Sequence, residues 1–124
     1  MTGGVERRRE PLDSSPGMGG DAVVAEFAQG EAWVVVVRGE FDLNTSGALA
    51  EALGAAARAR PRVVVDAAGV SFADSVFLTL LLRVHGQTDL RVAAPSPQLV
   101  RVLELTGADR VLDVRVTVED AVVE

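Results

Sequence analysis

The sequence predicts an α/β domain in which helices pack on a mixed β-sheet of about five strands. The chain has 124 residues, a length typical of a single domain. Apolar residues make up 48%, including 22 valines and 13 leucines, which is enough to form a hydrophobic core. Short valine-rich runs alternate with segments of helical period in the order β-β-α-β-α-β-α-β. Elements in this order with short links favour helices layered on a sheet.

Residues 1–20 differ in composition from the rest of the chain. They are rich in Gly, Pro, Ser and charged residues and have no periodic apolar pattern, so we predict a flexible tail followed by one domain over residues 21–124. The tail is neutral, with Arg7, Arg8 and Arg9 against Glu6, Glu10 and Asp13. The formal net charge of −6 therefore lies on the domain.

Two strands and a helix are expected first. Residues 23–27 and 33–38 have the composition of strands and are separated by a turn-like segment. A helix is predicted over residues 45–60, where one apolar stripe is formed by Leu49, Leu53 and Ala56. Asn44 or Thr45 is the expected cap of this helix, and Pro61 ends it.

The middle of the chain continues the alternation. The apolar run at residues 62–66 predicts a central strand covered on both faces. Residues 69–73 read as a loop, and Asp74 is placed to cap a helix that runs to about Val84. Another strand is expected over residues 90–93.

The last third predicts one more helix and strand. Ser96 and Pro97 are a typical cap and first-turn pair, and Gly107 is a typical helix end. Alternating valines over residues 114–118 predict a half-exposed last strand. Residues 119–124 can add at most about one helical turn.

Composition argues against an enzyme. The chain has no cysteine and no lysine, which excludes disulfides, zinc–thiolate sites and every mechanism that needs a lysine amine. The single histidine, His85, is expected at the end of a helix and without catalytic partners. We therefore expect no catalytic residue, no metal site and no cofactor.

Net charge and hydropathy limit the cellular location that we expect for the protein and the classes of partner that it can bind. A net charge of −6 disfavours binding to nucleic acid or to an anionic membrane. No apolar run approaches the roughly 20 residues of a membrane-spanning helix, so we expect no membrane insertion and a cytoplasmic protein.

The helix that follows Asp74 is apolar on nearly all sides. Its polar exceptions, Ser75, Thr79 and Arg83, are four residues apart and lie within roughly 80° of one another around the helix. Ser75 is thus expected at a helix N-terminus on the one solvent-facing stripe. Two interpretations stay open from the spacing: a hydroxyl that a kinase can reach, or a serine that only helps to cap the helix.

Four strings of the sequence recur in the order seen in STAS domains. They are Gly-Glu-Phe-Asp at 39–42, Val-Val-Val-Asp at 63–66, Val-x-Phe-x-Asp-Ser at 70–75 and Val-Leu-Glu-Leu-Thr-Gly at 102–107. Over residues 21–124 the chain resembles the anti-sigma factor antagonists of that family, of the actinobacterial type. The resemblance implies a STAS-like fold.

The resemblance also implies a regulatory cycle. In this family a partner serine kinase, itself the anti-sigma factor, phosphorylates the serine that corresponds to Ser75, next to Asp74. The unphosphorylated antagonist binds the anti-sigma factor and releases a sigma factor, and a phosphatase resets the cycle. This chain has Val76 and Phe77 where the family usually has Ser or Thr and then Gly.

The contact surface implied for the partner is centred on the start of the second helix. Its expected residues are Asp74, Ser75, Val76, Thr79 and Arg83, with a flanking turn of Glu40, Phe41, Asp42 and Leu43. One alternative keeps the fold but not the phosphorylation: a STAS binding or scaffold module, such as a partner of a transporter ATPase. A receiver domain that uses Asp66 as phospho-acceptor is disfavoured, because the chain lacks the lysine such domains need.

Overall fold

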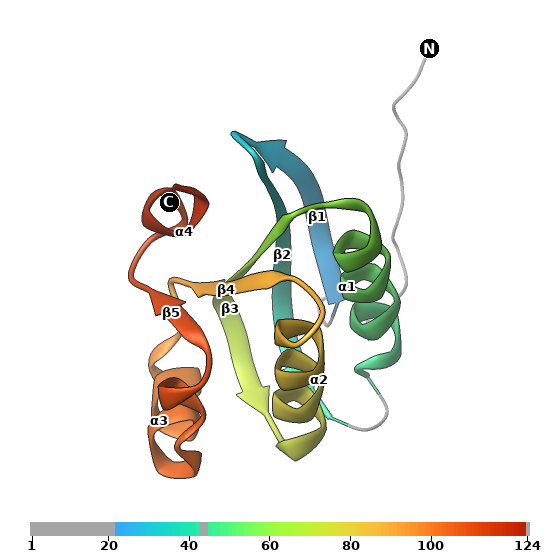
Figure 1. The fold of residues 1–124 in the computed structure, drawn as a ribbon. Coiled ribbons are helices and arrows are strands. Elements are labelled where there is room, and N and C mark those ends of the chain that lie inside the picture. Colours follow the sequence, from blue (N-terminus) through green and yellow to red (C-terminus); the bar gives the residue numbers. More distant parts are fainter. Residues whose placement is uncertain (1–21, 43–44, 124) are drawn as a thin grey trace.

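The fold is a five-stranded mixed sheet with helices on it, as the sequence predicts. A computed structural model describes residues 22–42 and 45–123 (Figure 1), so the predicted tail, Leu43 and Asn44 lie outside the described residues. The strand order along the sheet is the chain order. The first pair, β1 and β2, is antiparallel and all later neighbours are parallel. The strands are β1 (Ala22–Gln29), β2 (Ala32–Phe41), β3 (Arg62–Ala73), β4 (Asp89–Ala93) and β5 (Asp113–Arg115).

Three helices cover one face of the sheet. They are α1 (Gly47–Ala59), α2 (Ser75–His85) and α3 (Pro97–Thr106), and a short 3₁₀ turn, η2 (Ala108–Arg110), follows. Leucines from all three helices pack with strand valines such as Val35, Val65 and Val92 in the main core. This agrees with the rule that crossovers between parallel strands share one hand and so place successive helices on the same face.

A fourth helix, α4 (Val118–Val122), packs on the opposite face. Ala121 and Val122 of α4 contact Val34 and Val64, which alternate along their strands with residues of the main core. The valine-rich strands β2 and β3 are therefore buried on both faces, as expected for central strands.

Arginines from three strands hold the end of α4 on the sheet. Arg62 Nη1 donates to Val122 O at 2.9 Å, and Arg91 Nη1 donates to Ala121 O at 3.1 Å. Arg115 Nη1 donates to Asp120 O at 2.9 Å. Cations at the last carbonyls of a helix satisfy its free acceptors and oppose its dipole.

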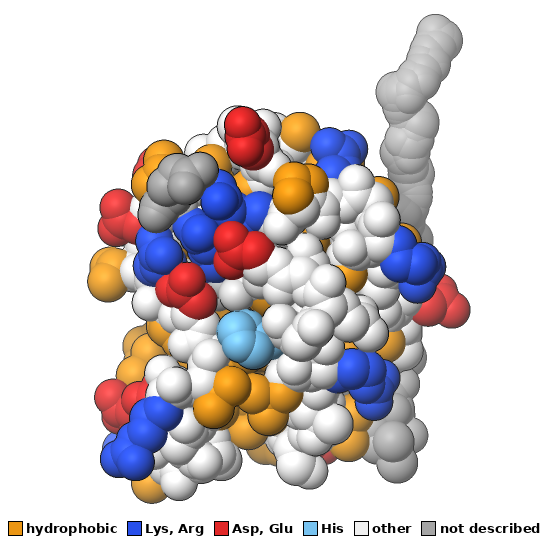
Figure 2. All heavy atoms as spheres, in the orientation of Figure 1, with side chains coloured by type: hydrophobic (Ala, Val, Ile, Leu, Met, Phe, Trp, Pro, Cys, Tyr) orange, Lys and Arg blue, Asp and Glu red, His pale blue; other side chains and the backbone are white. Residues whose placement is uncertain are grey.

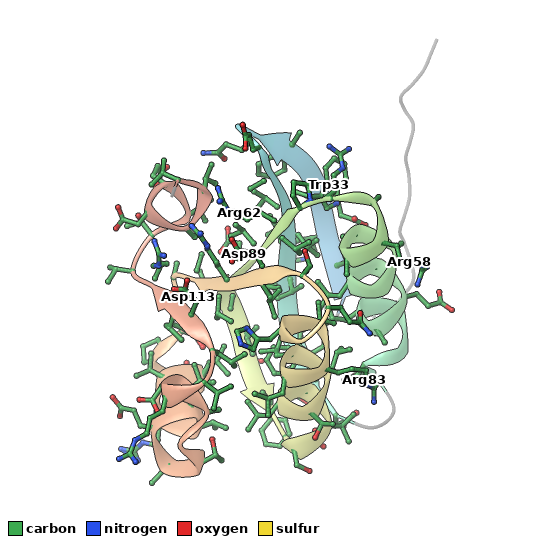
Figure 3. The ribbon with its side chains drawn as sticks, viewed as in Figure 1. Trp33, Arg58, Arg62, Arg83, Asp89 and Asp113 are labelled. Carbon is green, nitrogen blue, oxygen red and sulfur yellow. The ribbon has the colours of Figure 1, made fainter. Side chains whose placement is uncertain are left out.

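Two aspartates lie among these arginines. Asp89 Oδ2 is 3.1 Å from Arg62 Nε and 3.0 Å from Arg91 Nη2, and Asp113 Oδ1 is 2.6 Å from Arg115 Nε. We call these five residues the arginine clasp. Figure 3 labels Arg62, Asp89 and Asp113 in this corner, and Figure 2 shows acidic and basic side chains mixed over it.

The predicted loop at residues 69–73 is wrong, because β3 continues to Ala73. Glycine in the sequence indicates a break, but here it permits a bulge: the register shifts before the pair Arg38 and Gly69 and again after the pair Gly39 and Val70, and the pairing then resumes. Gly39 has φ +106°, a conformation that favours glycine. A Cβ on Gly69 would lie 3.1 Å from Val37 O, so the two strands approach closely there.

Two other boundaries also differ from the prediction. The last strand ends at Arg115, and Val118 begins α4, capped by Thr117 Oγ1, which accepts from Asp120 N at 3.0 Å. Valine alternation alone does not distinguish a strand from a turn that leads into a capped helix. The first helix begins at Gly47 with Ser46 in the cap position, in place of Thr45.

Candidate functional site

The junction between β3 and α2 is fixed by Asp74. Its Oδ1 accepts from Val76 N at 2.8 Å and from Phe77 N at 3.4 Å, which is the N-cap that the sequence predicts. The backbone N–H of Asp74 donates to Phe41 O at 3.1 Å, so the junction is tied to the end of β2. The start of α2 is thereby held at the edge of the sheet where β2 and β3 end.

The polar stripe of α2 faces solvent. Ser75, the first residue of α2, is exposed, and so are Thr79 and Arg83. Val76 is half-buried. Phe77 is fully buried and packs against Phe41, with ring centroids 5.3 Å apart. Phe77 therefore leaves the space in front of Ser75 open.

A shallow groove of about 390 Å³ runs between α1 and α2. It contains four of the residues predicted for the partner surface, and Figure 3 shows Arg83 between the two helices. The residues that line it are Ser46, Gly47 and Ala50 from the α1 side and Ser75, Val76, Thr79, Leu80 and Arg83 from the α2 side. Most of the lining is apolar, and Ser75 lies at the end where both helices begin.

The start of α1 contributes a residue that the sequence motifs do not predict as part of the site. Ser46 is only 4% exposed, and its Oγ has no hydrogen-bond partner among the residues that the structure describes. Its backbone is at φ −89°, ψ −4°, outside the extended region from which a serine normally caps a helix, and α1 has no side-chain cap. The sequence signal was a serine next to the predicted cap positions, but only the backbone angles show that it does not cap.

The predicted flanking turn is in part a strand, because Glu40 and Phe41 are the last residues of β2, and the segment braces the entrance to α1. The Asp42 carbonyl accepts from Ser46 N at 3.1 Å, and Asp42 Oδ1 accepts from Thr45 N at the same distance. The carbonyl of the exposed Glu40 accepts from Thr45 Oγ1 at 2.7 Å. Phe41 is fully buried, so its side chain supports Phe77 from inside and is not available to a partner. Leu43 lies outside the described residues.

Other kinds of site find little support in the described part of the chain. No group of three or more His, Asp or Glu residues there could hold a metal ion. None of the helices described is long and apolar enough to span a membrane. His85, at the end of α2, has a buried Nδ1 that finds no hydrogen-bond partner in the described part of the chain, and it does not line the groove.

Comparison with known proteins identifies the family. The profile of the family described as "Mlab, STAS domain" matches residues 24–116. An anti-sigma factor antagonist from Mycobacterium paratuberculosis is 32% identical, with a TM-score of 0.72 over 78% of this chain and 87% of that chain. An anti-sigma-factor antagonist (STAS) domain protein from Planctomyces limnophilus is 25% identical, with a TM-score of 0.68 over 79% of this chain and 93% of that one.

A third solved structure, of the anti-sigma factor antagonist SpoIIAA in its unphosphorylated form, shares the fold. It is 20% identical, with a TM-score of 0.67 over 82% of this chain and 93% of that chain. The search of curated proteins found no significant match. Because the family profile covers most of the sequence, the chain belongs to the STAS domain family.

Proposed function

We propose that this STAS domain is an anti-sigma factor antagonist whose binding is switched by phosphorylation of Ser75. The observation that carries the proposal is the exposed Ser75 hydroxyl at the start of α2, on the rim of the groove between α1 and α2. The antagonist from Mycobacterium paratuberculosis, at 32% identity, supports the same kind of function. The partner is an anti-sigma factor that is also an ATP-dependent serine kinase, and a phosphatase reverses the modification.

The proposed chemistry needs only an accessible hydroxyl on this chain. Ser75 Oγ attacks the γ-phosphorus of ATP held by the kinase, the bond to the β–γ bridging oxygen breaks, ADP leaves and the hydroxyl proton is lost. The kinase supplies the metal ion and the catalytic groups. Asp74 is engaged in capping α2, so it serves to hold Ser75 in place.

The phosphate would act on the interface. It adds about −1.5 to −2 charges beside Asp74 on a domain that already carries −6. Burying that charge against a partner costs a few kcal/mol in desolvation and repulsion, which is a tenfold or greater loss of affinity. The partner surface in this proposal is the groove with Asp74, Glu40 and Asp42 at its edge, and Phe41 acts from the core.

A tagged pull-down from the native host, with phosphosite mapping, tests the proposal directly. We expect a small serine kinase to copurify and phosphate to be found on Ser75. Recovery of a transporter ATPase or a large scaffold with unmodified Ser75 would instead support the non-phosphorylated binding module. Mapping on the whole chain also shows whether another serine, such as the exposed Ser71, carries the phosphate.

A binding titration with the recovered partner isolates the role of the charge. Ser75→Ala should bind like the wild type, and Ser75→Glu should bind at least about tenfold more weakly, because a carboxylate is buried at the interface. Ser71→Glu is the matched control, since it adds the same charge at an exposed serine on β3 outside the groove. Equal affinities of Ser75→Ala and Ser75→Glu would contradict the switch.

A further inference from the structure

The start of α1 has hydrogen-bonding capacity that the described residues leave unused. Ser46 Oγ has no hydrogen-bond partner despite its burial. The helix has no side-chain cap and no acidic residue in its first turn. The first N–H groups of a helix lack intrahelical acceptors and carry the positive end of its dipole, so this end favours an anion. The unpartnered hydroxyl beside it is a second, independent donor.

These donors and Ser75 line the same groove from its two sides. Ser46 and Gly47 line it from α1, and Ser75 lines it from α2. Figure 1 shows the two helices starting at the same edge of the sheet. A Cβ added to Gly47 would meet no atom within 4 Å, so the space in front of the first turn is open.

The N-terminus of α2 itself is already occupied. Asp74 Oδ1 accepts from the N–H groups of Val76 and Phe77, and its negative charge lies next to Ser75. A phosphate on Ser75 would therefore be repelled by the cap of its own helix. Among the helix-start N–H groups at this end of the groove, those of the first turn of α1, across the groove, are not engaged by a side-chain cap.

We propose that the start of α1 receives the phosphate of phospho-Ser75, through the Ser46 hydroxyl and the first-turn N–H groups. The inference rests on the proposed function, because it concerns the same modified serine. In this arrangement the phosphate bridges the beginnings of α1 and α2, and Ser46 is a positioning residue for the modified state. The hydroxyl that is buried without a partner in the unmodified chain gains one on phosphorylation.

The charged side chains around the groove change the second pKa of the phosphate in opposite directions. Arg83 lines the groove and favours the phosphate dianion, whereas the carboxylates on the elements that meet here oppose it: Glu40, Asp42, Glu51 and Asp74. The second pKa of phosphoserine is about 6. Hydrogen bonds to the charged form lower a pKa, so donors at α1 must outweigh these carboxylates to lower it.

The experiment uses the full chain with phosphoserine incorporated synthetically at position 75. A ³¹P NMR titration should give a second phosphate pKa about half a unit or more below that of the same chain unfolded in urea. Ser46→Ala and Ala48→Glu should each raise the pKa towards the unfolded value. The first removes a donor, and the second puts a carboxylate in the first turn of α1. The amide resonances of Gly47 and Ala48 should shift on phosphorylation in the wild type.

Ala55→Glu is the matched control, because it adds the same charge at an exposed position two turns along α1. It should leave the phosphate pKa unchanged. A wild-type pKa at or above the unfolded value, or a Ser46→Ala chain that titrates like the wild type, would overturn the inference. Since the phosphate is introduced without a kinase, this outcome is independent of whether a cellular kinase modifies Ser75.

Discussion

Ser46 shows how a single backbone conformation can reverse the usual effect of a substitution. A serine in the N-cap position normally stabilises a helix, and its replacement by alanine costs roughly 0.5–2 kcal/mol. Within residues 22–42 and 45–123, Ser46 makes no capping bond, and its buried hydroxyl has no hydrogen-bond partner. A buried hydroxyl in that state costs folding free energy of about 1–3 kcal/mol.

We therefore predict that Ser46→Ala stabilises the unphosphorylated chain. The free energy of unfolding should rise by about 1 kcal/mol, because the unsatisfied hydroxyl is removed and no cap is lost. Urea unfolding at neutral pH measures this change. Ser96→Ala is the contrasting control: Ser96 Oγ accepts from Leu99 N at 3.2 Å and donates to Val70 O at 2.5 Å, so its loss should destabilise by about 1–3 kcal/mol. A destabilised Ser46→Ala chain would mean that Ser46 does cap α1 in solution.

Through Asp89, the arginine clasp is expected to make the folding stability depend on pH. Burial raises the pKa of Asp89, but hydrogen bonds from Arg91 and Arg62 outweigh this effect and leave the pKa below its ordinary value of 3.8. A carboxyl whose pKa is lower in the folded state stabilises the fold above the unfolded pKa. That contribution is lost as the pH falls through the folded pKa.

Comparison of the wild type with Asp89→Asn tests this dependence. The wild type should be the more stable at pH 7, and the difference should shrink as the pH falls below about 4, where the Asp89 carboxylate becomes protonated. The effect should be small and sensitive to salt, because 42% of the Asp89 side chain is exposed. Urea unfolding across this pH range is the measurement, with the exposed Asp109→Asn as control. A difference that stays constant on acidification would exclude Asp89 as the titrating group.

At the scale of elements, the sequence predicts where a helix or strand begins and ends if that boundary depends on one local signal. The Ser96–Pro97 start and the left-handed Gly107 end of α3 follow directly from caps and glycine. The length of β3 does not follow from a local signal. Gly69 indicates the end of a strand, and only the pairing with β2, which Gly39 allows to resume, shows that β3 continues. The end of β5 likewise depends on the α4 cap and on arginines from two other strands, Arg62 of β3 and Arg91 of β4.

The residues of the candidate site likewise divide into those that one local signal predicts and those that depend on packing. Asp74 as cap and the exposed stripe of Ser75, Thr79 and Arg83 follow from helical periodicity, because they belong to one helix. The side of the groove that α1 lines does not follow from helical periodicity, because it depends on how α1 and α2 pack together. Phe41 was placed on the contact surface by its neighbours in sequence, whereas packing against Phe77 buries it.

In the molecule as a whole, the groove of the proposed switch lies apart from the arginine clasp that holds α4. The groove lies among the helices of one face, and the arginine clasp lies with α4 on the other. The groove also lies near the carboxyl ends of the parallel strands β2 and β3, the edge where ligand and partner sites gather in α/β sheets. A charge added at Ser75 therefore lies outside both cores and leaves them intact.

We predict that Ser75→Glu folds like the wild type. Its free energy of unfolding should change by no more than about 0.5 kcal/mol, because the added carboxylate is exposed to solvent, which screens its repulsion from Asp74. Phe77→Ala, two residues away, should cost about 3–5 kcal/mol, because it removes a fully buried ring from the core. Urea unfolding of both variants measures the contrast. If Ser75→Glu were as unstable as Phe77→Ala, weak binding by the charged form would reflect unfolding, and the switch would act on the fold instead of the interface.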